Sequence, residues 1–219
     1  MKSQKALYKE AMQVLKETSR TFYIPITFLT GDLKLAVATA YLAMRAIDEI
    51  EDHENLDNNT KHTLLQEISE LLKNTYDDTQ YFKIIEPYQD ILPEVTLRLG
   101  DWLTLCPEGA RSIVDSSLSE MAYGMGKWAG AGWVIHTRED LDEYTYYVAG
   151  LVGTMLSKLW YWSTGLQTDP DLAIGYGRGL QAVNILRNQH EDLDERGVRF
   201  VPDGWTREDL FAYAEENLA

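Results

Sequence analysis

The spacing of apolar residues constrains the fold of this chain more than any other feature. Apolar side chains recur mainly at intervals of three and four residues, which is the spacing of one helix face. No run of short alternating strands bounded by turn dipeptides interrupts this pattern. The sequence therefore predicts an all-α fold, with helices at about 4–18, 32–54, 60–74, 82–103, 108–126, 138–164, 171–194 and 206–218.

Local signals account for the breaks between these helices. The polar segment 57–60 forms a loop that leads into a cap, Pro107 stops one helix, and Pro170 starts another near its first turn. Thr206, followed three residues later by Asp209, resembles a capping box with Asp in place of Glu or Gln. The chain of 219 residues is long enough for one large core and too short for two comfortable ones, so residues 1–219 are expected to form a single domain.

The charge balance limits the classes of ligand. Lys and Arg total 20 against 35 Asp and Glu, a formal net charge of −15, so the overall field repels anions and does not favour nucleic acid. An anionic substrate must then be held by local Arg side chains or by a metal. The longest mostly apolar stretches, 35–44 and 146–156, fall short of the roughly 20 residues of a membrane-spanning helix.

The N-terminus and the cysteine content bear on the compartment. The first residues lead into a mixed amphipathic stretch instead of an apolar signal core, which argues against secretion. Cys106 is the single cysteine, so no intrachain disulfide can form and a reducing environment is compatible. Both observations favour a cytoplasmic location.

A polar face emerges from the apolar segment 36–47. Tyr41, Arg45, Asp48 and Asp52 follow the i, i+4, i+7, i+11 spacing and share one side of the predicted helix. Carboxylates at i and i+4 can converge on Mg²⁺, which prefers oxygen ligands and usually bridges protein carboxylates to substrate phosphates. Taken alone, an acidic run at a helix end is more often simply solvated.

A second polar face favours a functional site over a simply solvated helix end. In the mostly aliphatic helix predicted at 171–194, five oxygen-bearing side chains fall near one stripe: Gln181, Asn184, Asn188, Glu191 and Asp192. Polar groups on a buried face are costly unless they find partners. Two apolar helices that each carry an oxygen-rich stripe and an adjacent Arg suggest a polar site at the centre of a bundle, where facing helices commonly build metal sites.

Other candidates point to simpler roles. The four histidines, His53, His62, His136 and His190, lack the spacing of a zinc site. Gly175, Gly177 and Gly179 alternate without following a strand, so they favour helix opening or close packing over nucleotide binding. The segment 19–22 offers an Arg and two hydroxyls that could hold an anion, although a capping turn explains it equally simply.

The chain resembles the squalene and phytoene synthase family in segments that occur in the family's order. Tyr144–Gly153 is similar to the family's Tyr-Cys-x-x-Val-Ala-Gly-x-Val-Gly sequence, with Thr145 where Cys is usual. The other matching segments are Ser19–Phe22, Tyr41–Asp52, the glycine and methionine turn Met121–Gly126, Gln181–Asp192, and Arg199–Pro202. The Leu-Val-Gly form followed by Leu156–Leu159 looks closer to squalene synthases than to phytoene synthases.

This resemblance implies a fold and a reaction. The fold would be a single-domain helical bundle of the class I isoprenoid synthase type with a central cavity, here without the family's C-terminal helices. The reaction would join two farnesyl diphosphates head to head, through presqualene diphosphate, to squalene or a related C30 product, with Mg²⁺ and with NADPH in the reductive step. Two alternatives stay open: a phytoene, dehydrosqualene or hydroxysqualene type of synthase, or a noncatalytic module that binds a prenyl diphosphate.

The resemblance also assigns roles to residues. The metal ligands would be Asp48, Glu51, Asp52, Asn188, Glu191 and Asp192. The substrate-binding residues would be Arg20, Phe22, Tyr41, Arg45, Gln181, Asn184, Arg187 and Arg199. Tyr144 would be the proton-handling or cation-facing phenol, with Asp48, Asp52 and Asp192 as the other catalytic residues, and the small residues Ala149, Gly150 and Gly153 would leave room for prenyl chains.

The second acidic motif departs from the family's pattern, and the reaction that the resemblance implies determines which partners are expected. Asn188 stands where the family usually has Asp, so the second acidic motif loses one charge and should hold metal more weakly. The expected partner is a prenyl diphosphate, with no nucleic acid and no obligate protein partner. Because the product would be a hydrocarbon, peripheral contact with the inner face of a membrane is expected.

Overall fold

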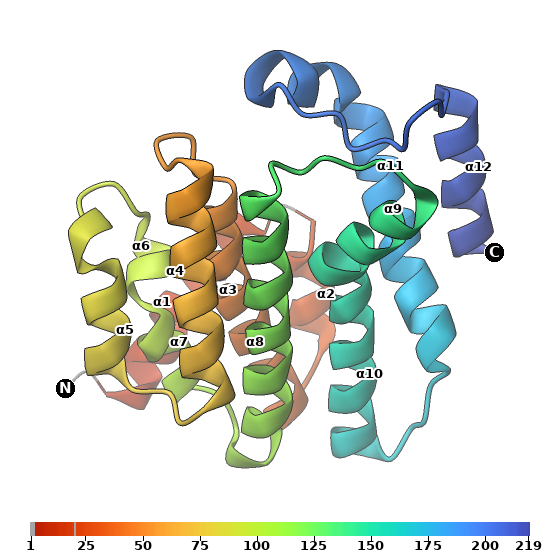
Figure 1. Ribbon diagram of the computed structural model, residues 1–219. Coiled ribbons are helices and arrows are strands. Elements are labelled where there is room, and N and C mark those ends of the chain that lie inside the picture. Colours follow the sequence, from red (N-terminus) through yellow and green to blue (C-terminus); the bar gives the residue numbers. More distant parts are fainter. Residues whose placement is uncertain (1–2, 20) are drawn as a thin grey trace.

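The computed structural model describes residues 3–19 and 21–219, except for the side chains of residues 190–192, 195 and 196. Within this part of the chain all regular secondary structure is helical, which confirms the all-α class (Figure 1). The first part comprises α1 (Gln4–Thr18), α2 (Tyr23–Phe28), α3 (Gly31–Glu51), α4 (Asn58–Lys73), α5 (Asp78–Ile85), the 3₁₀ turn η1 (Glu86–Tyr88), α6 (Glu94–Leu97), α7 (Leu99–Thr104) and α8 (Glu108–Gly130). The second part comprises α9 (Arg138–Thr145), the π-helical turn η2 (Tyr146–Gly150), α10 (Leu151–Thr164), α11 (Pro170–Arg196) and α12 (Arg207–Leu218).

Helix α3 is the central helix of the larger core. It packs against α1, α4, α6, α7, α8 and α10. Its apolar segment 36–47 is buried on most sides, with Ala36, Ala40 and Leu42 fully inaccessible. The Thr96 hydroxyl donates a hydrogen bond to the Ala46 carbonyl at 3.0 Å, which ties α6 to this helix. The acidic residues that follow the apolar segment are therefore placed on a rigid element.

Helices α4 and α8 lie side by side at close range (Figure 1). The Ser69 hydroxyl donates to the Ser119 carbonyl at 2.8 Å, and the Ser119 hydroxyl donates back to the Ser69 carbonyl at 2.9 Å. A Cβ at Gly126 would come within 2.7 Å of the Gln66 amide, so the glycine permits this approach. Small side chains and reciprocal hydrogen bonds thus hold the pair together.

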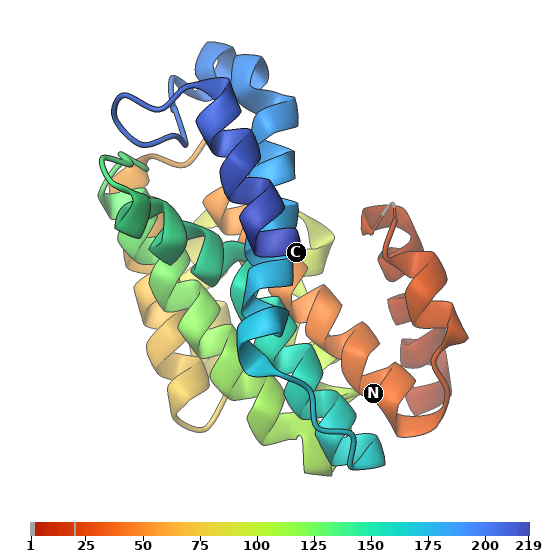
Figure 2. The same cartoon turned by 90° about the vertical axis from the view of Figure 1, so that its right-hand side faces the viewer.

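The second part of the chain packs along α11, which contacts α10, α12 and the π-helical turn (Figure 2). A Cβ at Gly153 would lie 2.1 Å from the Ala173 carbonyl oxygen, and one at Gly177 would lie 2.4 Å from that of Ala149. The expected room for prenyl chains at 149–153 is therefore occupied by the backbone of α11. These small residues instead allow the close packing of the helices.

Several predicted boundaries were wrong. The single helix expected at 82–103 is divided into α5, η1, α6 and α7, because Pro87 and Pro93 lack the N–H that a continuous helix requires. The helix expected at 108–126 continues to Gly130 as α8, so the segment Met121–Gly126, which resembles the family's glycine and methionine turn, is helical. Helix α2 was not predicted. The capping box at Thr206 and Asp209 is confirmed, because each accepts a hydrogen bond from the other's backbone N–H.

Among the described residues, no helix combines the length and apolar character that crossing a membrane requires.

Candidate functional site

Three carboxylates gather at the C-terminal end of α3. Asp48, Glu51 and Asp52 each offer one oxygen, and these three oxygens lie within 4.8 Å of one another. Helical spacing produces this arrangement, because residues at i, i+3 and i+4 share a face. Glu51 is buried with 4% of its surface exposed, whereas Asp48 and Asp52 are half-buried. An all-oxygen anionic donor set that is partly withdrawn from water fits a hard divalent cation such as Mg²⁺.

Arg45 lies one turn before these acids and pairs with two carboxylates. Its guanidinium donates to Asp48 at 2.6 Å and to Glu49 at 2.5 and 2.8 Å. Burial lowers the pKa of Arg45, but the charges of Asp48 and Glu49 outweigh this effect and the net pKa is raised. Arg45 therefore stays cationic beside the carboxylates that a metal would use.

Tyr41 connects this face of α3 to the N-terminal segment. Its hydroxyl donates to the Thr18 carbonyl at 3.2 Å, and its ring centroid lies 6.0 Å from that of Phe22. Burial, the largest effect, raises the pKa of Tyr41 and keeps its phenol neutral. Phe22 itself is 54% exposed. The predicted substrate-binding residue Arg20 lies outside the described residues.

Tyr144 of α9 lies in a second hydrophobic cluster, which also contains Trp128, Trp133 and Phe200. Its ring stacks on Phe200 with centroids 4.9 Å apart and an interplanar angle of 15°, and it meets Trp128 edge-on at 5.9 Å. Only 5% of Tyr144 is exposed. The predicted substrate residue Arg199 is exposed and donates to the Trp205 carbonyl at 2.9 Å. Phe200 of the segment 199–205 therefore covers one face of the Tyr144 ring.

The polar stripe predicted on α11 is only partly sheltered. Asn184 is exposed, so the expectation of a buried stripe was wrong for this residue, and Gln181 and Asn188 are only half-buried. The adjacent Arg187 is exposed. Asn188 donates to Asn184 at 3.4 Å and accepts from Arg187 at 3.2 Å. The side chains of Glu191 and Asp192 lie outside the described residues. Periodicity identified the shared face but carried no information about what covers it.

Helices α3 and α11 run toward the same end of the bundle, the upper end in Figures 1 and 2. Both helices pack against α10, which therefore connects them. The fold therefore directs the two predicted metal motifs to one end of the molecule.

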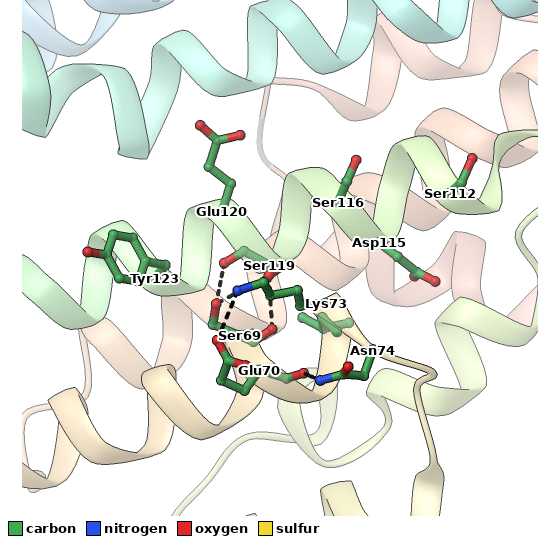
Figure 3. A pocket seen from close by; sticks show the side chains of 11 residues that line it. Ser69, Glu70, Lys73, Asn74, Ser112, Asp115, Ser116, Ser119, Glu120 and Tyr123 are labelled. Atoms are coloured by element: carbon green, nitrogen blue, oxygen red, sulfur yellow. Dashed lines mark hydrogen bonds and ion pairs between the residues drawn. The ribbon is translucent and has the colours of Figure 1, made fainter.

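An open groove lies elsewhere, between α4 and α8 (Figure 3). Ser69, Glu70, Lys73, Ser119 and Tyr123 are among its lining residues. The two serines hydrogen-bond to each other's backbone, and Lys73 pairs with Glu70 at 3.4 Å. None of the predicted site residues that the structure describes lines this groove, and we interpret it as a surface feature of the helix pair.

The sequence reasoning missed Trp133, which contacts the acid cluster directly. Its indole Nε1 donates a hydrogen bond to the Glu51 carboxylate at 2.5 Å. The residue follows α8 and is 82 positions away from Glu51 in the sequence. The only local signal is Gly132 just before it, which marks a helix end but does not indicate where the next side chain points.

The fold is an all-α bundle that presents a cluster of three carboxylates at the end of its central helix. The sequence model of the squalene/phytoene synthase family matches residues 15–218. The chain therefore belongs to the squalene/phytoene synthase family.

Curated relatives and a solved structure agree with this assignment. The chain is 34% identical over 209 residues to Botryococcus squalene synthase of Botryococcus braunii, which covers 93% of this chain and 43% of that protein. It is 35% identical over 220 residues to squalene synthase of Eremothecium gossypii, covering 95% and 48% respectively. A structure of TcSQS in complex with the ligand BPH1237 superposes with a TM-score of 0.72 at 26% identity, covering 97% of this chain and 66% of that one. The chain thus spans less than half the length of these curated relatives.

Proposed function

We propose that this chain catalyses a Mg²⁺-dependent, head-to-head condensation of two farnesyl diphosphates, through presqualene diphosphate, to squalene or a related C30 product. The observation that supports the proposal most is the trio Asp48, Glu51 and Asp52, whose oxygens lie within 4.8 Å of one another on a buried helix. Membership of the squalene/phytoene synthase family and likeness to several squalene synthases favour this substrate class.

The residues on α3 suit the first step of such a reaction. When bound, Mg²⁺ would neutralise the charge that develops on the departing diphosphate. Asp48, Glu51 and Asp52 would hold it through carboxylate oxygens, the ligands that Mg²⁺ prefers. Arg45 adds a permanent positive charge one turn away and can turn from Asp48 toward the diphosphate when a metal occupies that carboxylate.

Loss of diphosphate leaves an allylic carbocation, which water would destroy. Apolar and aromatic walls exclude water and offer π-faces that stabilise positive charge. Phe22 and Tyr41 supply aromatic rings beside the polar face of α3, and Tyr144 supplies a buried phenol. We assign Tyr144 to stabilising the cation or handling its proton.

The second metal motif is the weaker one in this proposal. Asn188 offers a neutral amide oxygen in place of a carboxylate, and Arg187 already donates to that oxygen at 3.2 Å. Glu191 and Asp192 would supply the remaining charge of this cluster. Gln181, Asn184, Arg187, Arg199 and Arg20 would contact the diphosphates.

Incubation of the protein with farnesyl diphosphate and Mg²⁺, with and without NADPH, followed by mass analysis of the extracted lipids, tests the proposal. We expect diphosphate release and a C30 hydrocarbon with NADPH. Asp48→Asn and Asp52→Asn should each reduce turnover by orders of magnitude, whereas Glu54→Gln, at an exposed carboxylate just beyond the cluster, should retain activity. Absence of both diphosphate release and a C30 product would refute the proposal.

The product mass separates the related reactions. Squalene requires NADPH, while dehydrosqualene or hydroxysqualene would form without it, and phytoene would form only from geranylgeranyl diphosphate.

We propose a cytoplasmic enzyme that contacts a membrane peripherally, because a hydrocarbon product must leave into an apolar phase.

Asn188 favours a second candidate, a noncatalytic module that binds a prenyl diphosphate. This candidate predicts Mg²⁺-dependent binding of farnesyl diphosphate without turnover. Turnover by the unaltered chain would contradict it, whereas turnover that appears only in Asn188→Asp would support it.

A further inference from the structure

A tryptophan beyond the predicted site residues holds one of the three acids. Trp133 and Glu51 are both buried, with 7% and 4% of their surfaces exposed, and the indole N–H donates to the carboxylate at 2.5 Å. A buried carboxylate is costly unless it is hydrogen-bonded. A carboxylate has about four lone-pair directions, so this one hydrogen bond does not occupy all of them.

The backbone at the end of α8 aims the indole at Glu51. Gly132 and Trp133 both adopt left-handed conformations, with φ of 66° and 53°. The Gly132 N–H donates to the Ala129 carbonyl and the Trp133 N–H to the Trp128 carbonyl, each at 3.0 Å, which ends the helix and reverses the chain. This backbone conformation is uncommon and strained for a bulky non-glycine residue. Such strain persists where the surroundings over-determine it, often at functional sites.

The chemistry of the donor separates Trp133 from Arg45. Arg45 binds Asp48 through an ion pair, which a metal must displace or share. The indole is a neutral donor and fixes the position of Glu51 without adding a positive charge. Lys61 of α4, itself buried, places its ammonium 5.1 Å from the centroid of the Trp133 ring. Helix α4, the end of α8 and α3 thus converge around this one side chain.

We propose that Trp133 is a positioning residue for the metal site, holding the Glu51 carboxylate in the place from which it binds a divalent cation together with Asp48 and Asp52. The inference rests on the proposed metal site. Hydrogen-bond partners of metal ligands typically contribute 10- to 100-fold to metal affinity, because they fix the orientation of the ligand.

Mn²⁺ binding, followed by electron paramagnetic resonance of the free ion, tests this proposal without any turnover. Trp133→Phe keeps an aromatic ring but removes the donor, and we expect about 10-fold weaker Mn²⁺ binding. Trp102→Phe is the matched control, because the Trp102 indole is also buried and donates to the Val95 carbonyl at 2.8 Å, but not to the cluster. It should lower thermal stability and leave Mn²⁺ affinity unchanged.

A double-mutant cycle separates positioning from general stabilisation. In a Glu51→Gln background, adding Trp133→Phe should change Mn²⁺ affinity no further, because the indole acts through that carboxylate. If Trp133→Phe does not fold, site-specific replacement of Trp133 by benzothienylalanine removes the N–H and keeps the ring shape, with the same expected loss. Unchanged Mn²⁺ affinity in the folded variant would overturn this inference alone. Failure of the unaltered protein to bind Mn²⁺ would overturn the metal site as well.

Discussion

The contact between α11 and the π-helical turn predicts that Gly177→Ala destabilises the protein. The added Cβ would lie 2.4 Å from the Ala149 carbonyl oxygen, 2.7 Å from its carbonyl carbon and 2.8 Å from the Gly150 Cα. All three atoms belong to the backbone of the π-helical turn, which cannot move aside as a flexible side chain can. The two helical segments must therefore separate.

The expected magnitude is a balance of two effects. Replacing a helix-interior glycine by alanine gains about 1 kcal/mol of helix propensity. Overpacking a close contact costs roughly 1–3 kcal/mol, and a clash with backbone on this scale belongs at the upper end. The net free energy of unfolding should fall by about 2 kcal/mol, which lowers the melting temperature by roughly 4–8 °C for a chain of this size.

Thermal unfolding followed by circular dichroism measures this effect. Gly175→Ala is the matched control in the same helix, because its Cβ would meet only the Asn217 carbonyl, at 3.0 Å and 3.9 Å from its oxygen and carbon. The gain in helix propensity and the cost of this milder contact should nearly cancel, so the free energy of unfolding of Gly175→Ala should stay close to that of the unaltered chain. A Gly177→Ala protein as stable as the unaltered chain would refute the packing argument, and equal losses in both variants would show that the contact with Ala149 is not decisive.

Two further predictions concern stability. The pKa of Asp140 lies below its usual range because its carboxylate accepts a hydrogen bond from the Thr137 backbone N–H. The ionised form therefore stabilises the folded protein above the unfolded-state pKa of about 4. This stabilisation is lost as the pH falls through the lower folded-state pKa. Asp140→Asn should flatten the fall of melting temperature between about pH 5 and pH 3, and an unchanged slope would contradict this assignment. Ser69→Ala removes the buried bond to the Ser119 carbonyl and should cost about 1 kcal/mol in denaturant unfolding. Exposed Ser112→Ala should cost nothing, and equal stability of the two variants would count against the reciprocal pair.

The sequence predicted the parts of the fold that depend on local pattern. Apolar periodicity identified the all-α class and the central helix, and the bounds predicted for the first helix, 4–18, agree with α1. It also placed Asp48 and Asp52 on one face. The division of 82–103 was missed because apolar periodicity outweighed Pro87 and Pro93 in the interpretation, although proline is a known helix breaker.

Features that depend on contacts distant in sequence could not be predicted in this way. The bond from Trp133 to Glu51 requires the left-handed end of α8, and the filling of the space at 149–153 requires knowledge of where α11 lies. The exposure of Asn184 likewise depends on which elements cover α11 and not on its own sequence. Resemblance to the family supplied residue roles that periodicity alone left open.

Binding of farnesyl diphosphate with and without Mg²⁺, measured by isothermal titration calorimetry, tests the central claim most directly. The claim is that Asp48, Glu51 and Asp52 bind a divalent cation that in turn binds a prenyl diphosphate. We expect binding that requires Mg²⁺, that is lost in Asp48→Asn/Asp52→Asn, and that persists in Glu54→Gln. Equally tight binding without Mg²⁺, or by the double variant with Mg²⁺, would contradict the account.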